Sequence, residues 1–404
     1  MARTAIGRAS TRVGFAWARI TCVFVVIVEH CAHLLGPHAG LLGFVTPPGF
    51  GRLGHLALLA LFAMSGFQIA DSWLSEPSWW RFAYKRVLRI WPPLLFVTML
   101  SAFVLGPLVT TKSQADYWSS PITWAYVVDN AGLVHLRHPL PGVFWTNPYP
   151  YSVNGSLWTL PMEVFGYLVV LVFGVAGLLR RGRPALLPLT AGLLVTDALI
   201  GAGGTGAGAI GGFGSIPYGA LLTMMAPFAL GMVLRCYSDM LPLRPGVVLV
   251  LLPGFMVVNL FLPALAVPAA AVMVTYAAVV FALHVPARWT SASRWAYGSY
   301  GAFAMSFPLQ QLLVFAGVRD EVPLVLLSVP LSYLAGQLSW YLIEKPTQRL
   351  RPKPLRPRRP DVPLAPSAGW DGRGEPGRDP VELGARDVGV GAGDGRGEQH
   401  GPPA

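Results

Sequence analysis

Residues 16–35 read AWARITCVFVVIVEHCAHLL, an apolar run long enough to cross a bilayer as one helix. Arg19 and His30 interrupt this run. Their eleven-residue spacing corresponds to about 1100° of α-helix, so both side chains lie on one face, about 16 Å apart along the axis. Ionisable groups at such depth are costly and usually face a bundle interior, which indicates a functional face. The alternative is that His30 only packs between helices.

The composition indicates a membrane protein. The chain has 404 residues, of which 53% are hydrophobic and only 12% are charged, and its mean hydropathy is +0.52. Such a chain has too few polar residues to cover a soluble surface. We therefore predict an all-α membrane protein, a bundle of about ten transmembrane helices. The expected spans are residues 16–35, 54–74, 93–111, 156–179, 184–201, 216–234, 246–263, 265–285, 295–317 and 322–343.

Basic residues alternate between the expected loops. One set of loops and the two ends carry Arg3, Arg8, Arg12, Arg81, Lys85, Arg86, Arg89, Arg180, Arg181, Arg183, Arg235, Arg244, Arg288, Arg294 and the run from Lys345 to Arg359. The opposite loops carry only Arg52, Lys112, Arg137 and Arg319. The positive-inside rule then places both termini in the cytoplasm. The same rule accounts for the net charge of +11, so no nucleic-acid partner is expected.

The chain divides into two expected parts. Residues 1–351 form the transmembrane domain, and residues 352–404 form a cytoplasmic tail so rich in Pro, Gly and Arg that we expect it to be disordered. The first apolar run lacks a cleavage site and is expected to remain in the mature protein. The cysteines show no metal-ligand spacing, and no metal is expected.

Two segments between spans stand out. Residues 112–155 form the one long external loop, and its tryptophans and tyrosines could stack on sugar rings or sit in an interfacial belt. The glycine-rich run at residues 201–215 lacks the Lys-Ser/Thr ending of a phosphate-binding loop, so we predict a flexible turn there.

A basic cluster follows the second span, in the stretch RFAYKRVLRIWPP at residues 81–93. Arg81, Lys85 and Arg89 recur at the helical i, i+4, i+8 spacing at the cytoplasmic surface, with Arg86 three residues before Arg89. Guanidinium groups bind phosphate bidentately, so this cluster suits a phosphate-bearing cytosolic ligand. The alternative is a surface helix that binds lipid headgroups.

The fourth span begins with SLWTLPMEVFGYL at residues 156–168 and places Glu163 near its outer edge. His30 lies in the outer half of the first span, which runs in the opposite direction, so the two residues are expected at similar depth. We predict His30 as a general base and Glu163 as the carboxylate that orients it. Glu29 is the competing partner, but it points about 100° away around the helix.

These motifs, together with SGF at residues 65–67 and SWYLIEKPTQRL at residues 339–350, resemble membrane acyltransferase family 3 in order and spacing. Arg19 and His30 match the family's first-helix motif, Arg86 and Arg89 its Arg-x-x-Arg motif, and Glu163 the acidic position of its fourth-helix motif. Ser65, Trp158 and Ser306 complete the expected substrate-binding set. The sequence departs from the family at Ser306, where many members carry His, and at Gln68, where an aliphatic residue is commoner.

The resemblance implies an O-acyltransferase in the bacterial plasma membrane. It would move an acyl group, commonly acetyl, from cytosolic acyl-CoA to a hydroxyl of an extracytoplasmic glycan or glycosylated metabolite. Acyl-CoA would be a substrate, and no permanently bound cofactor is expected. In this interpretation Arg86 and Arg89 hold CoA phosphates and Arg19 stands at the mouth of the cavity. A transporter or flippase of a polar lipid or glycoside, or a non-catalytic membrane scaffold, are the alternatives.

Overall fold

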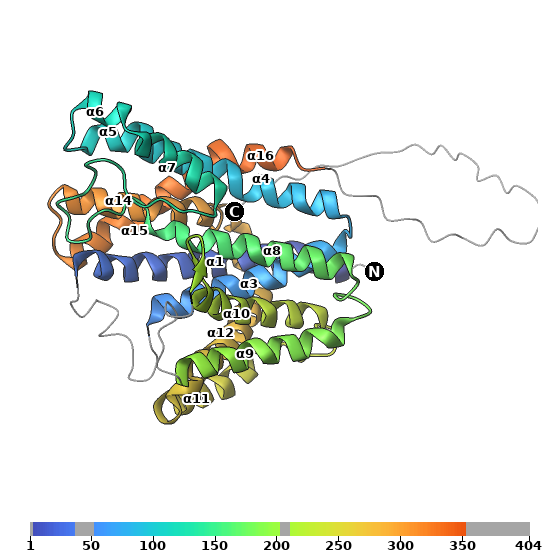
Figure 1. The fold of residues 1–404 in the computed structure, drawn as a ribbon. Helices are drawn as coiled ribbons and strands as arrows, with labels where there is room; N and C mark the ends of the chain where they lie inside the picture. Colours follow the sequence, from blue (N-terminus) through green and yellow to red (C-terminus); the bar gives the residue numbers. More distant parts are fainter. Residues whose placement is uncertain (1–2, 37–51, 203–210, 353–404) are drawn as a thin grey trace, which may run out of the picture. The chain divides into compact units, whose positions relative to one another are not determined.

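A computed structural model of the chain describes residues 3–36, 52–202 and 211–352 (Figure 1). This part is predominantly helical, with only a short two-stranded sheet in the described residues, which confirms the predicted all-α class. The expected tail, from residue 353 onward, lies outside the described residues. The helices and strands are α1 (Arg3–Leu35), α3 (Leu53–Ser75), α4 (Trp79–Leu100), η1 (Ser101–Leu105), α5 (Gly106–Val109), α6 (Gln114–Ser119), α7 (Pro121–Gly132), η2 (Gly155–Thr159), α8 (Leu160–Val175), η3 (Arg183–Ala185), α9 (Leu186–Ala202), β1 (Gly212–Phe213), β2 (Ile216–Pro217), α10 (Tyr218–Cys236), α11 (Pro245–Phe261), η4 (Pro263–Leu265), α12 (Ala266–Leu283), α13 (Ala287–Ser291), η5 (Ser293–Trp295), α14 (Ser299–Phe315), α15 (Glu321–Ser339), η6 (Trp340–Glu344) and α16 (Lys345–Arg349).

Helix length and apolar composition identify a multi-pass membrane protein. Within the described residues, eight helical stretches are long and apolar enough to cross a membrane: Val13–Leu35, Leu53–Ser75, Trp79–Val109, Gly155–Val175, Arg183–Ile200, Tyr218–Cys236, Pro263–Leu283 and Glu321–Arg349. The two other expected spans are also helical, as α11 and α14, each of 17 residues. The full count of ten spans stays a prediction.

The third span differs from the expectation. We expected it at residues 93–111, with the basic cluster on a separate stretch before it, but α4 runs unbroken from Trp79 through Pro92 and Pro93. A π-helical segment, η1, then connects it to α5. Prolines are tolerated inside membrane helices because local adjustments satisfy the freed carbonyls. The basic cluster therefore belongs to the first turns of the span itself.

Helix α3 lies at the centre of the bundle, packed against α1, α8, α10 and α12 (Figure 1). Two glycines allow its close approach to α10. A Cβ at Gly66 would lie 1.9 Å from the carbonyl oxygen of Phe228, and one at Gly231 would lie 2.1 Å from that of Ala63. Backbone atoms cannot yield as a flexible side chain can, so α3 is locked in place along this contact.

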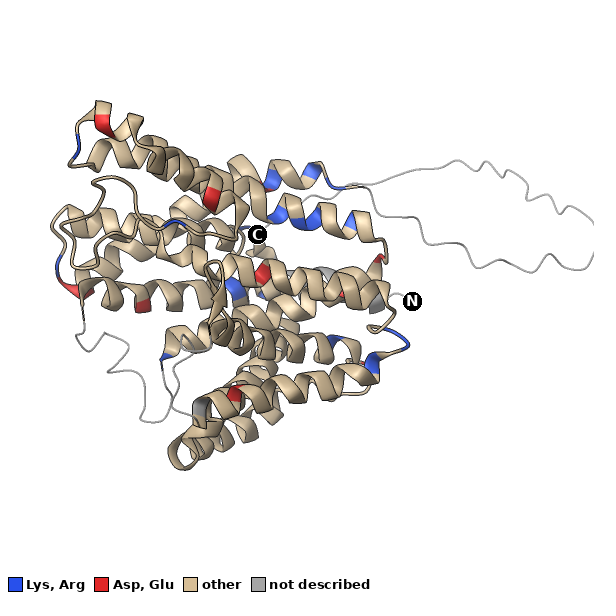
Figure 2. Ribbon diagram, viewed as in Figure 1, with Lys and Arg blue, Asp and Glu red and all other residues tan. Residues whose placement is uncertain are grey.

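Basic residues gather at one end of the bundle. Figure 2 shows Lys and Arg concentrated where α4 begins and where α8 is connected to α9. Helix α6 lies at the opposite end (Figure 1). This distribution agrees with the loop alternation in the sequence, and the cytoplasmic position of the termini stays a prediction.

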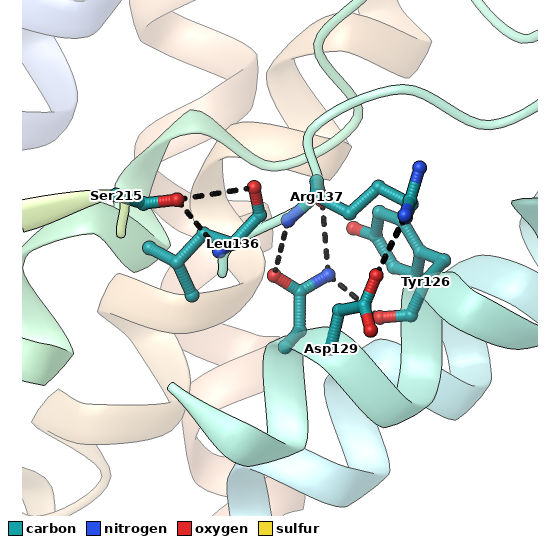
Figure 3. Close-up of polar contacts among 6 residues, drawn as sticks. Tyr126, Asp129, Leu136, Arg137 and Ser215 are labelled. Atoms are coloured by element: carbon teal, nitrogen blue, oxygen red, sulfur yellow. Dashed lines mark hydrogen bonds and ion pairs between the residues drawn. The ribbon is translucent and has the colours of Figure 1, made fainter. Parts of the chain in front are cut away.

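The long loop after α5 folds into α6, α7 and an irregular segment that is tied to the β1–β2 hairpin. Arg137 Nε donates to Asp129 at 2.8 Å, and the backbone N–H of Leu136 donates to Ser215 Oγ at 2.8 Å (Figure 3). At Gly214, with φ +59°, a Cβ would lie 2.2 Å from the carbonyl oxygen of Val134. The end of the predicted turn at residues 201–215 is thus part of a hairpin that is hydrogen-bonded to this loop. Residues 203–210 lie outside the described part.

Candidate active site

One face of α1 lines two adjoining cavities. Arg19 and Val23 line the first, and Val26, His30 and His33 line the second. These positions recur every three or four residues, so they form one stripe along the helix. The spacing argument from the sequence placed Arg19 and His30 on one face, and both residues indeed point into the interior from that stripe.

The first cavity, which we name the arginine cavity, has a volume of about 60 Å³. It combines charged groups with an apolar wall. Its lining residues are Arg19, Val23, Leu58, Leu61, Phe62, Ser65, Arg89, Thr159, Leu160, Glu163, Ser299, Tyr300 and Phe303. The predicted site residues Arg19, Ser65, Arg89 and Glu163 therefore lie together.

Two side chains of α3 hold the guanidinium of Arg19. Its Nε donates to Gln68 Oε1 at 3.0 Å, and its Nη2 donates to Ser65 Oγ at 2.9 Å. Ser65 and Gln68 are three residues apart and so share one face of α3. Ser65, which we expected to bind substrate, supports Arg19 in this structure.

Arg89 is held by Glu344 and Tyr300, from the C-terminal part of the chain. Its Nη1 donates to Glu344 Oε2 at 2.9 Å, and its guanidinium lies 5.5 Å from the ring centroid of Tyr300. Glu344, only 4% exposed, comes from η6 at the far end of the chain. Arg89 thus lines the arginine cavity while one of its donors is already paired.

Glu163 and Arg86 meet at Tyr167. The Tyr167 hydroxyl donates to Glu163 Oε1 at 2.5 Å. Arg86 packs its guanidinium against the rings of Phe82 and Tyr167 and donates to Ser72 Oγ at 3.3 Å. Arg86 is not among the residues that line either cavity, so it supports the wall behind Glu163.

The charged side chains that line the arginine cavity do not cancel. Two guanidinium groups, Arg19 and Arg89, stand against one carboxylate, Glu163, which leaves one positive charge among the lining residues. Buried charges in a membrane protein are expensive and usually mark a substrate site. An excess positive charge suits a ligand that is anionic or becomes anionic during reaction.

The second cavity, which we name the histidine cavity, has a volume of about 480 Å³. This falls within the roughly 300–1,000 Å³ typical of small-molecule sites. Its lining residues are Val26, Glu29, His30, His33, Arg52, Gly54, His55, Leu58, Tyr149, Gly155, Trp158, Thr159, Phe303 and Phe307. Trp158, which we expected to bind substrate, lies here with His30.

His30 has one aromatic ring as a close neighbour. Its ring packs edge-on against that of Phe307, with 5.6 Å between the ring centroids. Its buried Nδ1 has no hydrogen-bond partner among the described residues. Glu29 is engaged with Arg52, whose Nε lies 2.7 Å from its Oε1. The described residues contain no hydrogen bond between His30 and Glu163, which line different cavities, so the pairing of the two stays a prediction.

The two cavities share a wall. Leu58, Thr159 and Phe303 line both of them. The charged groups of the arginine cavity and the imidazole of the histidine cavity therefore lie on either side of three side chains.

Besides Arg86, two predicted site residues, Lys85 and Ser306, do not line either cavity. Lys85 pairs with Glu76, which also accepts from Arg81 at 2.5 Å, near the start of α4. Ser306 is fully buried, and its hydroxyl donates to the carbonyl oxygen of Phe303 at 2.9 Å. The structure therefore gives both residues local partners, and their roles in substrate binding stay predictions.

Several residues of these cavities were not singled out from the sequence. Tyr167 lies four residues after Glu163 and so faces the same way, which is a signal that the sequence offered. Glu344 stands within the SWYLIEKPTQRL motif as a lone acid at a membrane edge. His33 lies three residues after His30 and so faces the same way, which is the same kind of signal. His55 and Tyr149 offered no comparable signal, because only the fold brings them to this cavity. No group of three or more His, Cys, Asp or Glu side chains in residues 3–36, 52–202 and 211–352 could hold a metal ion.

The fold and the site define a polytopic helical membrane protein with charged and imidazole groups facing internal cavities. The particular family is given by comparison with known proteins. The chain belongs to membrane acyltransferase family 3, because the family model described as an acyltransferase domain matches residues 12–339. This confirms both the resemblance and the predicted enzyme class.

A curated relative agrees with the family. The chain is 26% identical over 344 residues to a protein of Shigella phage Sf6 named O-acetyl transferase, a match covering 82% of this chain and 94% of that protein. No solved structure matches the chain.

Proposed function

We propose that the protein transfers an acyl group, with acetyl as the first candidate, from cytosolic acyl-CoA to a hydroxyl of an extracytoplasmic glycan or glycoside. The observation that carries this proposal is the pair of adjoining cavities on one face of α1. The small, positively charged arginine cavity suits the thioester end of the donor. The larger aromatic histidine cavity suits a sugar acceptor. The name of the phage relative supports transfer to oxygen.

In the proposed reaction, His30 accepts the proton of the acceptor hydroxyl as the oxygen attacks the thioester carbonyl carbon. The carbonyl oxygen gains negative charge, which the guanidinium of Arg19 is suited to stabilise by hydrogen bonding. The carbon–sulfur bond then breaks, CoA leaves as a thiolate that takes up a proton, and the acceptor carries the new ester. A thioester is already activated, so this step requires only positioned donors and a base.

The acceptor would bind beside aromatic rings. Trp158 and Tyr149 line the histidine cavity, and Tyr149 lies 4.9 Å from the ring of His33. Aromatic faces pack against the apolar faces of sugar rings, while imidazole groups can exchange hydrogen bonds with hydroxyls. This arrangement supports a carbohydrate more than an acyl chain as the occupant of the larger cavity.

The donor would approach from the basic end of the bundle. Arg89 lines the arginine cavity and belongs to the helix whose first turns carry the basic cluster. Guanidinium groups there would hold the phosphates of CoA, with Arg89 the closest of them to the acyl group. We place the protein in the bacterial plasma membrane, where cytosolic acyl-CoA and surface glycans meet on opposite faces.

The test is a comparison of glycans from a strain that lacks the protein. Mass spectrometry of surface glycans and secreted glycosides should show the loss of one class of acyl ester in that strain. Wild-type protein should restore the ester, and His30→Gln should not. Identical ester profiles with and without the protein would overturn the proposal.

A further inference from the structure

Arg19 is the first residue of the cavity-lining stripe of α1, and its orientation is fixed from α3. Gln68 accepts from Nε at 3.0 Å and Ser65 accepts from Nη2 at 2.9 Å. A guanidinium group can only donate, so Gln68 must present its carbonyl oxygen. These two bonds define the plane of the guanidinium as well as its position.

The platform behind these bonds is rigid. Gly66 lies between Ser65 and Gln68, and a Cβ there would lie 1.9 Å from the backbone oxygen of Phe228 in α10. Helix α3 therefore cannot rotate or slide without separating from α10. The acceptor atoms of Ser65 and Gln68 hold fixed positions relative to the arginine cavity.

Two bonds leave most of the guanidinium available. Arginine has five N–H donors, and Gln68 and Ser65 engage two of them, so three can serve a reactant. Arg19 lines the same cavity as Glu163 and Arg89, and these donors are therefore close to the proposed acyl site. An aliphatic side chain at position 68 would leave the Arg19 Nε–H without its partner and the guanidinium free to turn.

We propose that Gln68 is a positioning residue that aims the guanidinium of Arg19 into the arginine cavity. This inference rests on the proposed function for its kinetic consequence, but not for its geometry. It also gives a physical role to Gln68, which follows the SGF motif and departs from the family pattern. Gln68 acts through Arg19 and does not itself touch the reactants.

The first measurement is the affinity of purified protein for a stable thioether analogue of acetyl-CoA. Gln68→Leu should weaken binding roughly ten- to a hundredfold, the range for one hydrogen bond to a charged group. Gln337→Leu is the matched control. The Gln337 amide donates to the carbonyl oxygen of Tyr297 at 2.7 Å, and neither residue lines a cavity. This variant should bind the analogue as the wild type does. In an Arg19→Lys background, Gln68→Leu should cause no further loss of affinity, since lysine has no guanidinium Nε–H for Gln68 to bind. An equal loss in both backgrounds, or none in either, would overturn the proposal.

A second measurement is independent of acyl transfer. Hydrogen exchange of the Arg19 Nε–H, followed by nuclear magnetic resonance, should be slow in wild type and in Gln68→Glu, which keeps an oxygen acceptor. It should be fast in Gln68→Leu. Equal exchange in all three proteins would contradict the positioning role. Failure of wild type to bind the analogue, with slow exchange intact, would count against the proposed function and leave the positioning of Arg19 supported.

Discussion

At the scale of single residues, His30 Nδ1 is one of several buried side-chain atoms without a hydrogen-bond partner among the described residues, and it belongs to a residue that lines a cavity. Buried polar atoms are nearly always hydrogen-bonded, and exceptions in native proteins often mark functional groups. His30 Nδ1 is such an exception, in a cavity of about 480 Å³. A base that must accept a proton benefits from this arrangement, because no existing bond has to break first.

This leads to a prediction for His30. His30→Ala and His30→Gln should each lower acyl transfer by roughly a hundred- to ten-thousand-fold, the usual loss for a general base, because neither side chain accepts a proton near neutral pH. The measurement is the turnover of radiolabelled acetyl-CoA by membranes that contain equal amounts of each protein. A histidine that only packs would tolerate Gln far better than Ala, so near-native turnover by His30→Gln would exclude it as the base.

Tyr167 gives a second prediction at this scale. Tyr167→Phe removes the hydroxyl that donates to Glu163 at 2.5 Å, and a hydrogen bond to a charged group contributes about 1.5–3 kcal/mol. Catalytic efficiency should therefore fall roughly ten- to a hundredfold if the position of Glu163 matters. Tyr333→Phe is the control. The Tyr333 hydroxyl donates to the carbonyl oxygen of Trp295 at 3.1 Å, and neither residue lines a cavity. Equal efficiency of the two variants would show that the hydrogen bond from Tyr167 to Glu163 does not contribute to catalysis.

At the scale of elements, the contact between α3 and α10 determines whether the site is held in place. It depends on glycines that allow backbone to meet backbone. Gly66→Ala should destabilise the protein by about 1–3 kcal/mol, the usual cost of overpacking. The thermal midpoint of detergent-solubilised protein measures this. Gly192→Ala in α9, where a Cβ would meet nothing within 4 Å, should leave the midpoint unchanged or raise it. A midpoint unaltered by Gly66→Ala would contradict the rigid contact.

The elements also show how far the sequence could predict the structure. Helical spans followed from apolar runs, and the shared face of Arg19 and His30 followed from their spacing, because both depend on local helix geometry. The sequence did not predict that α4 starts at Trp79, because a span is recognised by a run of apolar residues and the first turns of this helix are basic. Arg86 and Arg89 seemed equivalent in sequence, yet only Arg89 lines a cavity. Partners such as Gln68 for Arg19 and Glu344 for Arg89 depend on tertiary packing that no local pattern contains.

At the scale of the whole molecule, the distribution of charge predicts the orientation in the membrane. Basic residues gather at the end where α4 begins (Figure 2). The positive-inside rule assigns this end to the cytoplasm. In a background without the native cysteines, cysteine at Ala115 in α6 should react with an impermeant thiol reagent in intact cells. Cysteine at Ser78, before α4, should react only after permeabilisation. The reverse pattern would overturn the orientation and the assigned side of acyl-CoA together.

The central claim is that one bundle brings a cytosolic donor and an external acceptor together at its two adjoining cavities. The most direct test uses sealed right-side-out vesicles from a host strain, which carry their own surface glycans. Radiolabelled acetyl-CoA enclosed inside the vesicles should label those glycans with wild-type protein and not with His30→Gln, and the same donor supplied only outside should leave them unlabelled. Labelling from outside, or none from inside despite correctly inserted protein, would contradict the account.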